Sequence, residues 1–278
     1  MARLKVPDFV PKSVAFVGAP ADTIGSKEDY LAGTCFFIGR VSPRTNLAHV
    51  YLITARHVVN ATLQATGGKV YIRLNHNDWG GQWIDTVASD WIMGPAKIDA
   101  AVLAFMPALQ NIDHTVIPAY SMATQARLRE NNQSVDLGDD LIISGLFIHH
   151  YGQQRNIPIV RIGNVATLLE HDVAASLGPG WHDMINAYLI EARSIGGLSG
   201  SPVFVHRLEE GTPTFALLGL MQGHYGTKAA KSGEAANEES VNVGIGIVVP
   251  ADDLEEVFRQ PEIIELEERL DDATLAQS

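Results

Sequence analysis

Short apolar segments rich in β-branched residues recur along the chain, and Gly, Pro, Asn and Asp separate them. Segments of this kind, bounded by turn-forming residues, predict strands. Many short strands with little helix predict an all-β protein built from antiparallel barrels or sandwiches. The clearest predicted strands cover residues 33–40, 48–54, 69–74, 100–105, 141–147, 157–165, 187–192, 202–206, 215–221 and 241–249.

Helical patterns are confined to residues 58–65, 122–130 and 252–270. In the last of these, Asp252 is followed three residues later by Glu255, which predicts a capping box at the helix start. Pro261 is expected to kink or restart this helix.

The polar segment 119–140 predicts a connector between two halves of the chain. We therefore expect an N-terminal β-barrel over 1–118, a C-terminal β-barrel over 141–250, and an acidic C-terminal helix and tail over 251–278. A further segment, 226–240, contains no large apolar residue and is expected to be a mobile loop.

The composition and net charge of the chain argue against several classes of function. Of the 278 residues 46% are hydrophobic, enough for a sizeable core, and the net charge of −12 argues against a nucleic-acid-binding surface. Much of the acidity follows Ala251, where ten acidic and two basic side chains occur. The single cysteine, Cys35, fits a reducing compartment. Because no apolar run approaches the length of a membrane span, we expect a soluble, cytoplasmic protein without a membrane partner.

Three segments carry candidate chemistry. Ser199 lies in Gly-Gly-Leu-Ser-Gly-Ser-Pro (196–202), where glycines expose the hydroxyl and leave amide N–H groups available to an oxyanion. His57 follows a predicted strand and Asp99 precedes another. A serine nucleophile needs a base, which imidazole supplies near neutral pH, and a carboxylate orients that imidazole. Each residue also has a structural alternative: a buried histidine with its bonds satisfied, an aspartate capping a turn, and a serine in a plain turn. Ser201 is the alternative nucleophile.

The segments 54–57, 99–103, 197–202 and 217–223 resemble, in this order, the motifs of the chymotrypsin-like (trypsin-fold) serine peptidases. Without disulfides, the chain is most similar to the intracellular bacterial and viral-like branch. The resemblance implies two antiparallel six-stranded β-barrels with a C-terminal α-helix, and an active site in the cleft between the barrels. It implies a catalytic triad of His57, Asp99 and Ser199.

The same resemblance implies further roles. The oxyanion hole is formed by the N–H groups of Gly197 and Ser199, and the backbone of Gln222 and Gly223 pairs with an extended substrate. Arg193, six residues before the nucleophile, lies at the base of the specificity pocket. Together with His224 at the rim, it favours Asp or Glu before the cut. Alternatively, Arg193 turns outward to pair with Glu191 or solvent. No cofactor and no metal are expected.

The sequence thus predicts a serine endopeptidase that cleaves protein or peptide substrates through an acyl-enzyme. We expect its activity to be gated by a protein partner or by ordering of the 226–240 loop. Two alternatives stay open: a catalytically silent binding or scaffold module, and an esterase-type acyl hydrolase on the same fold.

Overall fold

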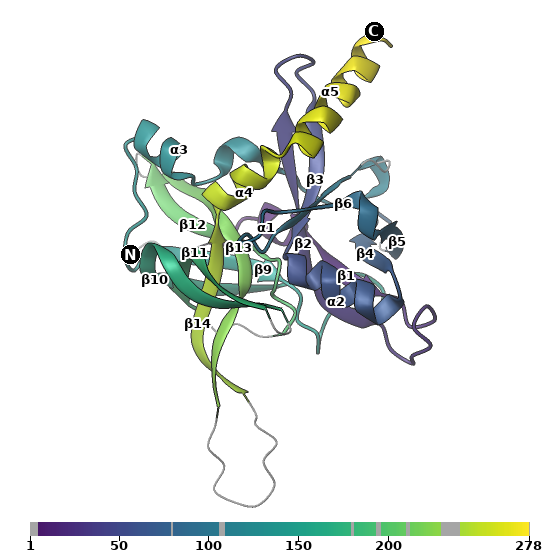
Figure 1. The fold of residues 1–278 in the computed structure, drawn as a ribbon, viewed down its shortest axis with the longest axis horizontal. Coiled ribbons are helices and arrows are strands. Elements are labelled where there is room, and N and C mark those ends of the chain that lie inside the picture. Colours follow the sequence, from purple (N-terminus) through teal and green to yellow (C-terminus); the bar gives the residue numbers. More distant parts are fainter. Residues whose placement is uncertain are drawn as a thin grey trace, which may run out of the picture.

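The computed structural model describes residues 5–277 except 79, 106–108, 179–180, 193–195, 210–211 and 229–239. The first half, drawn in purple to blue in Figure 1, forms one sheet. Its strand order is β5-β4-β1-β2-β3-β7-β6, and β8 pairs with β2. The helix α1 precedes this sheet, and α2 follows β3. The bounds are α1 Phe9–Lys12, β1 Val14–Ala19, β2 Tyr30–Val41, β3 Ala48–Thr54, α2 Arg56–Thr66, β4 Lys69–Asn75, β5 Gly81–Val87, β6 Trp91–Met93, β7 Ala101–Ala104 and β8 Ile117–Pro118.

This sheet differs from the closed six-stranded barrel that the resemblance implies. Within the described residues no backbone ladder joins its two ends, β5 and β6. The two strands follow one another in the chain, and the Trp91 indole N–H donates to the Thr86 hydroxyl at 2.9 Å. Because β6 has only three residues and its ladder is with β7, the sheet curls without closing.

The second half forms a closed barrel in the order β10-β11-β14-β13-β12-β9. Its strands β10 and β13 are the longest of the described chain, and each forms a hairpin with the strand that follows it. The bounds are β9 Asp140–Gly145, β10 Ile159–Gly178, β11 Trp181–Glu191, β12 Pro202–Glu209, β13 Thr212–Lys228 and β14 Ser240–Pro250.

The predicted 226–240 loop is shorter than expected. Gly226, Thr227 and Lys228 still pair with β14, so the ends of that segment are strand. Most of the remainder, 229–239, lies outside the described residues.

Helices α3 (Gln125–Glu130), α4 (Ala251–Phe258) and α5 (Pro261–Leu275) complete the fold. Pro261 separates α4 from α5, as expected, but the predicted capping box is wrong. The N-cap of α4 is Pro250, and the Asp252 carboxylate instead accepts the Gln125 N–H at 3.0 and 3.1 Å. Asp252 therefore caps the start of α3, a contact between residues far apart in the sequence.

The C-terminal helix α4 packs against the N-terminal sheet. Leu254, Val257 and Phe258 of α4 are buried in the same core as β2 and β3, and the rings of Phe258 and Tyr51 lie 5.2 Å apart, edge to face. No helix among the described residues is both long and apolar enough to cross a membrane.

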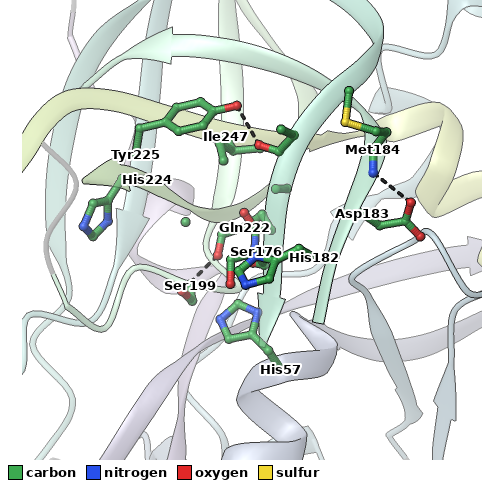
Figure 2. Close-up of a pocket in the computed structure, with 13 residues that line it drawn as sticks. His57, Ser176, His182, Asp183, Met184, Ser199, Gln222, His224, Tyr225 and Ile247 are labelled. Atoms are coloured by element: carbon green, nitrogen blue, oxygen red, sulfur yellow. Dashed lines mark hydrogen bonds between the residues drawn. The ribbon is translucent and has the colours of Figure 1, made fainter. Parts of the chain in front are cut away.

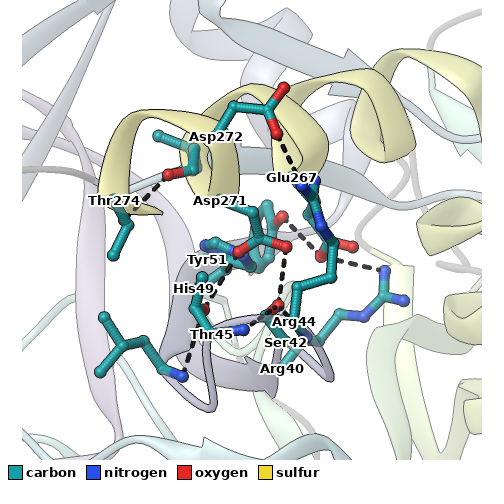
Figure 3. A network of polar contacts seen from close by, with 12 residues as sticks. Arg40, Ser42, Arg44, Thr45, His49, Tyr51, Glu267, Asp271, Asp272 and Thr274 are labelled. Atoms are coloured by element: carbon teal, nitrogen blue, oxygen red, sulfur yellow. Dashed lines mark hydrogen bonds and ion pairs between the residues drawn. The ribbon is translucent and has the colours of Figure 1, made fainter. Parts of the chain in front are cut away.

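Helix α5 lies along the β2–β3 hairpin and is held there largely by polar contacts (Figure 3). The Asp271 carboxylate accepts from the hydroxyls of Ser42 at 2.7 Å and Thr45 at 3.1 Å, and lies 3.0 Å from His49 Nε2. One turn earlier, Glu267 accepts from the Tyr51 hydroxyl at 2.8 Å.

Candidate active site

His57 lies in the first turn of α2, which begins at Arg56, shortly after β3 ends at Thr54. Two bonds fix it on Asp99. The His57 backbone N–H donates to Asp99 Oδ1 at 3.0 Å, and His57 Nδ1 lies 2.6 Å from Asp99 Oδ2. Asp99 is completely buried, whereas 23% of the His57 side chain is exposed. A carboxylate against Nδ1 selects the tautomer that leaves Nε2 as an acceptor toward the cavity.

The Ser199 turn depends on two glycines with left-handed backbone, Gly197 (φ +99°) and Gly200 (φ +85°). A Cβ at Gly200 would collide with the Thr34 carbonyl oxygen, because the turn packs directly on β2. The Ser201 N–H donates to the Leu198 carbonyl at 2.9 Å and closes the turn.

Thr34 of β2 anchors this turn, a role that the sequence analysis missed. Its N–H donates to the Ser199 carbonyl at 2.9 Å, and its hydroxyl donates to the Gly197 carbonyl at 2.8 Å. The same hydroxyl accepts the Leu146 N–H at 2.9 Å. The sequence signal for this role was a polar residue inside the apolar run 33–38, because a fully buried hydroxyl needs hydrogen-bond partners.

Ser199 and His57 line one cavity of about 780 Å³ between the two halves of the chain (Figure 2). The Ser199 hydroxyl donates to the Gln222 carbonyl at 3.0 Å. Within the described residues no hydrogen bond joins Ser199 to His57. The structure therefore brings histidine and aspartate into contact and places the serine in the same cavity, with its hydroxyl directed elsewhere.

The two predicted oxyanion donors lie on the same turn. Neither the Gly197 N–H nor the Ser199 N–H has an acceptor among the described residues. The Leu198 carbonyl accepts from Ser201, so in the same trans peptide the Ser199 N–H points away from the turn interior.

Of the other predicted site residues, three line the cavity and one lies outside the described residues. Gln222 and Gly223 line the cavity, and Gly223 also pairs with Ile247 of β14. His224 lines it as well, and burial lowers the pKa of its imidazole, which favours the neutral ring at pH 7. Arg193 lies outside the described residues, so its predicted contact with acidic substrates stays a prediction.

Ser201, the alternative nucleophile, is completely buried and does not line the cavity. The β10–β11 hairpin, in contrast, contributes lining residues that the sequence analysis did not single out as part of the site, among them Ser176, His182 and Met184. No cluster of three metal-ligating side chains occurs in the described part of the chain.

No protein-family model matches the sequence, and no curated protein matches it significantly. Among solved structures, the chain is similar to the MamO protease domain from Magnetospirillum magneticum in its apo form. The two are 14% identical with a TM-score of 0.54, over 91% of this chain and 99% of that domain. The chain has a trypsin-like protease fold.

Two structures of the Rv3671c protease from M. tuberculosis are also similar to this trypsin-like chain. The active form is 16% identical with a TM-score of 0.48, over 90% of this chain and 80% of that one. The inactive form is 17% identical with a TM-score of 0.47, over 90% and 88%. The similarity to the MamO protease domain confirms the prediction at the level of the trypsin-like fold, with the first sheet open.

Proposed function

We propose that this chain is a serine endopeptidase that acts through a triad of His57, Asp99 and Ser199. The observation that carries the proposal is the His57 imidazole, held at 2.6 Å by a buried carboxylate and facing the cavity that Ser199 lines. In a trypsin-like fold, this pairing supplies the oriented base that a serine hydroxyl needs.

The residues of the site then have complementary roles. Ser199 Oγ attacks the scissile carbonyl while His57 Nε2 takes its proton, and the Asp99 charge stabilises the resulting imidazolium. The N–H groups of Gly197 and Ser199 donate to the developing oxyanion. His57 returns the proton to the leaving amine, and water attacking with His57 as base hydrolyses the acyl-enzyme.

The attack requires one movement. The Ser199 hydroxyl must leave the Gln222 carbonyl and turn toward His57 Nε2. Control of this rotation fits an enzyme that is gated by a protein partner or by the 226–240 segment. The proposal includes cytoplasmic location, membership of the intracellular bacterial and viral-like branch, and recognition of acidic residues by Arg193 with His224.

A catalytically silent scaffold is the second candidate. The observation that favours it is the Ser199 hydroxyl itself, which in this structure is bonded to a backbone carbonyl and not to the base. An esterase-type acyl hydrolase would use the same groups and differs only in its substrate.

The test is cleavage of unstructured casein, with new termini mapped by mass spectrometry. Ser199→Ala should reduce cleavage by about 10⁴-fold or more, and Asp99→Asn by about 10⁴-fold, the size measured for the triad of serine peptidases. Ser201→Ala is the matched control and should cleave normally.

Equal cleavage by wild type and Ser199→Ala would overturn the proposal. Turnover of small esters without casein cleavage would indicate the esterase. Inertness toward both, with and without added cell extract as a source of activators, would indicate the scaffold.

A further inference from the structure

A second cavity, of about 320 Å³, lies beside α4 and is termed the α4 cavity. Its lining comes from three parts of the chain that are far apart in the sequence: the 95–98 loop, the β10–β11 hairpin and α4. Met184 of β11, labelled in Figure 2, lines both this cavity and the one that contains Ser199. The two cavities are therefore neighbours.

The α4 cavity is lined by a buried carboxylate that has a neutral partner and no cationic one. Only 6% of Asp253 is exposed, and Asn186 Nδ2 donates to its Oδ1 at 3.2 Å. Within the described residues, Asp253 Oδ2 accepts no hydrogen bond from another side chain and Asp253 forms no ion pair. Burial, together with the negative charges of Glu256 and Asp252, raises the pKa of the Asp253 carboxyl to about 6. Because a buried charge is costly unless it is paired, a cation that entered this cavity would be stabilised.

The basic side chains that line the α4 cavity are directed to other partners. Lys97 has 67% of its side chain exposed, and its Nζ lies 4.0 Å from Asp183 Oδ1. His171 Nδ1 lies 3.0 Å from Asn186 Oδ1. The positive charge that would pair with Asp253 must therefore come from a bound molecule.

We propose that the α4 cavity binds a primary ammonium group on an aliphatic chain, the chemistry shared by a lysine side chain and a free polyamine. The ammonium bonds Asp253 Oδ2, and the exposed Glu256 adds attraction at the rim. Ile98 and Met184 are apolar lining residues that the methylene chain contacts. Because Asn186 occupies Oδ1, the remaining oxygen suits a point-charge ammonium better than a bidentate guanidinium.

The position of the α4 cavity makes it an effector site, and this part rests on the proposed function. Ile98 immediately precedes Asp99 in the chain. The Pro95 carbonyl accepts from the guanidinium of Arg56, the residue before His57, at 2.9 Å. A ligand in the cavity therefore contacts the loop that holds the Asp99 carboxylate against His57, and its binding changes the reactivity of the triad.

The binding test titrates the full chain at pH 7.5 with cadaverine and, separately, with N-acetyl-lysine methylamide, followed by NMR shifts of the amides of 95–98 and 253–256. Asp253→Asn should weaken binding of the ammonium about tenfold or more, the worth of a hydrogen bond to a charged group. Glu262→Gln is the matched control. It removes the same charge from an exposed position outside the cavity and should change the affinity less than about twofold.

N-acetyl-norleucine methylamide, which has the aliphatic chain without the ammonium, should not bind. Binding of both amines supports a site open to free polyamines, and binding of the lysine amide alone supports a site for a lysine of a protein partner. Equal affinity of wild type and Asp253→Asn, equal binding of the norleucine amide, or no binding of either amine would overturn the inference.

The effector role has a separate readout, the rate at which a fluorophosphonate labels Ser199. A saturating amine should change this rate about fivefold or more in the wild type, the lower end of typical coupling between sites, and should leave it unchanged in Asp253→Asn. Binding without any change in rate would overturn the effector role. Binding as expected, with no labelling of Ser199 in any condition, would overturn the proposed function alone.

Discussion

Thr34 joins the nucleophile turn to the N-terminal sheet through one buried side chain. Its hydroxyl donates to the Gly197 carbonyl and accepts from the Leu146 N–H, so it connects β2, the Ser199 turn and the end of β9. Replacing the hydroxyl by a methyl group of the same shape leaves both partners buried without a bond. Thr34 therefore sets the position of Ser199 relative to His57.

We predict that Thr34→Val lowers the free energy of unfolding by about 1–3 kcal/mol, the cost of unsatisfied buried groups. Casein cleavage should fall with it, because misplacement of a reacting group by a fraction of an ångström is costly. Urea unfolding and cleavage rates measure both effects. Thr34→Ser keeps the hydroxyl and is the control; if it loses as much activity as Thr34→Val, the hydroxyl is not the anchor.

At the residue scale, sequence patterns identified the groups with strong chemical signatures. The structure places His57 and Asp99 in contact and Ser199 in the cavity that His57 lines, while their catalytic roles stay a prediction. The bond from Ser199 to the Gln222 carbonyl, and the placement of Ser176 and His182 in the cavity lining, were not predictable. Both features depend on the lengths of the β10–β11 and β13–β14 hairpins, whose residues line the cavity. The residue types alone do not encode these lengths.

At the scale of elements, Asp252 illustrates how a local motif is redirected by tertiary structure. Its spacing from Glu255 is that of a capping box, but its carboxylate accepts the first N–H of α3. Glu255 instead pairs with Arg127 at 3.2 Å. The two acidic residues thus hold α4 against α3 rather than capping α4.

Asp252→Ala should destabilise the fold by about 0.5–2 kcal/mol, as loss of a helix cap does. Glu255→Ala removes a partly exposed ion pair and should cost less than about 1 kcal/mol. Chemical denaturation of both variants measures the difference. A larger loss for Glu255→Ala than for Asp252→Ala would favour the local capping box instead.

Asp253, on the same helix, predicts a pH dependence. Burial raises the pKa of its carboxyl to about 6, against an ordinary value near 3.9 in the unfolded chain. Between about pH 4 and pH 6 the folded state holds a proton that the unfolded state has lost. The free energy of unfolding therefore decreases as pH rises through this window, by at most about 3 kcal/mol.

Asp253→Asn keeps an acceptor for Asn186, which donates to Asp253 at 3.2 Å, and removes the titration. It should stabilise the protein by about 1–3 kcal/mol at pH 7.5 and leave stability nearly unchanged near pH 4. Urea titrations at the two pH values test this. An equal gain at both would exclude burial of the charge as the cause.

Strand prediction succeeded where apolar runs are continuous and failed where burial is partial. β3 has its predicted bounds. β5 was missed because its side chains are mostly exposed or half-buried. In addition, Gly81 is its first residue and Gly80 precedes it, a pair that favours a loop in sequence-based prediction. β10 extends well past the predicted 157–165. Its distal part buries only Val173 and Ala175 between exposed residues, which is a weaker apolar signal than a continuous run.

At the scale of the whole molecule, the two halves are held together in part by the C-terminal helices. α4 contributes apolar side chains to the core of the N-terminal sheet, and α5 attaches mainly through the network around Asp271 and Glu267 (Figure 3). Hydrogen bonds from Ser42, Thr45 and His49 hold the pKa of Asp271 below its usual range. A helix attached by polar contacts is expected to open locally before the core unfolds.

We predict that Asp271→Asn speeds amide exchange in α5 at least about tenfold while exchange in β3 is unchanged, because only the attachment of the helix is lost. Asp272→Asn is the matched control. It removes the exposed pair with Arg44, and should change exchange little. Equal acceleration in α5 and β3 would mean that the network stabilises the entire fold.

The open N-terminal sheet and the closed C-terminal barrel also differ in how far sequence could predict them. Both halves carry similar apolar strand patterns, so the sequence predicts sheets in each. Closure depends on ladder length at the ends of the sheet, and the three-residue β6 was not recognised. The proposed division at 119–140 into separate units stays a prediction.

The central claim is that Ser199 is an activated nucleophile, and labelling by a fluorophosphonate tests it most directly. Intact-mass analysis should give one adduct per chain, mapped to Ser199, absent in Ser199→Ala, retained in Ser201→Ala and slowed in Asp99→Asn. An unlabelled wild-type chain, or an adduct that persists in Ser199→Ala, would contradict the account.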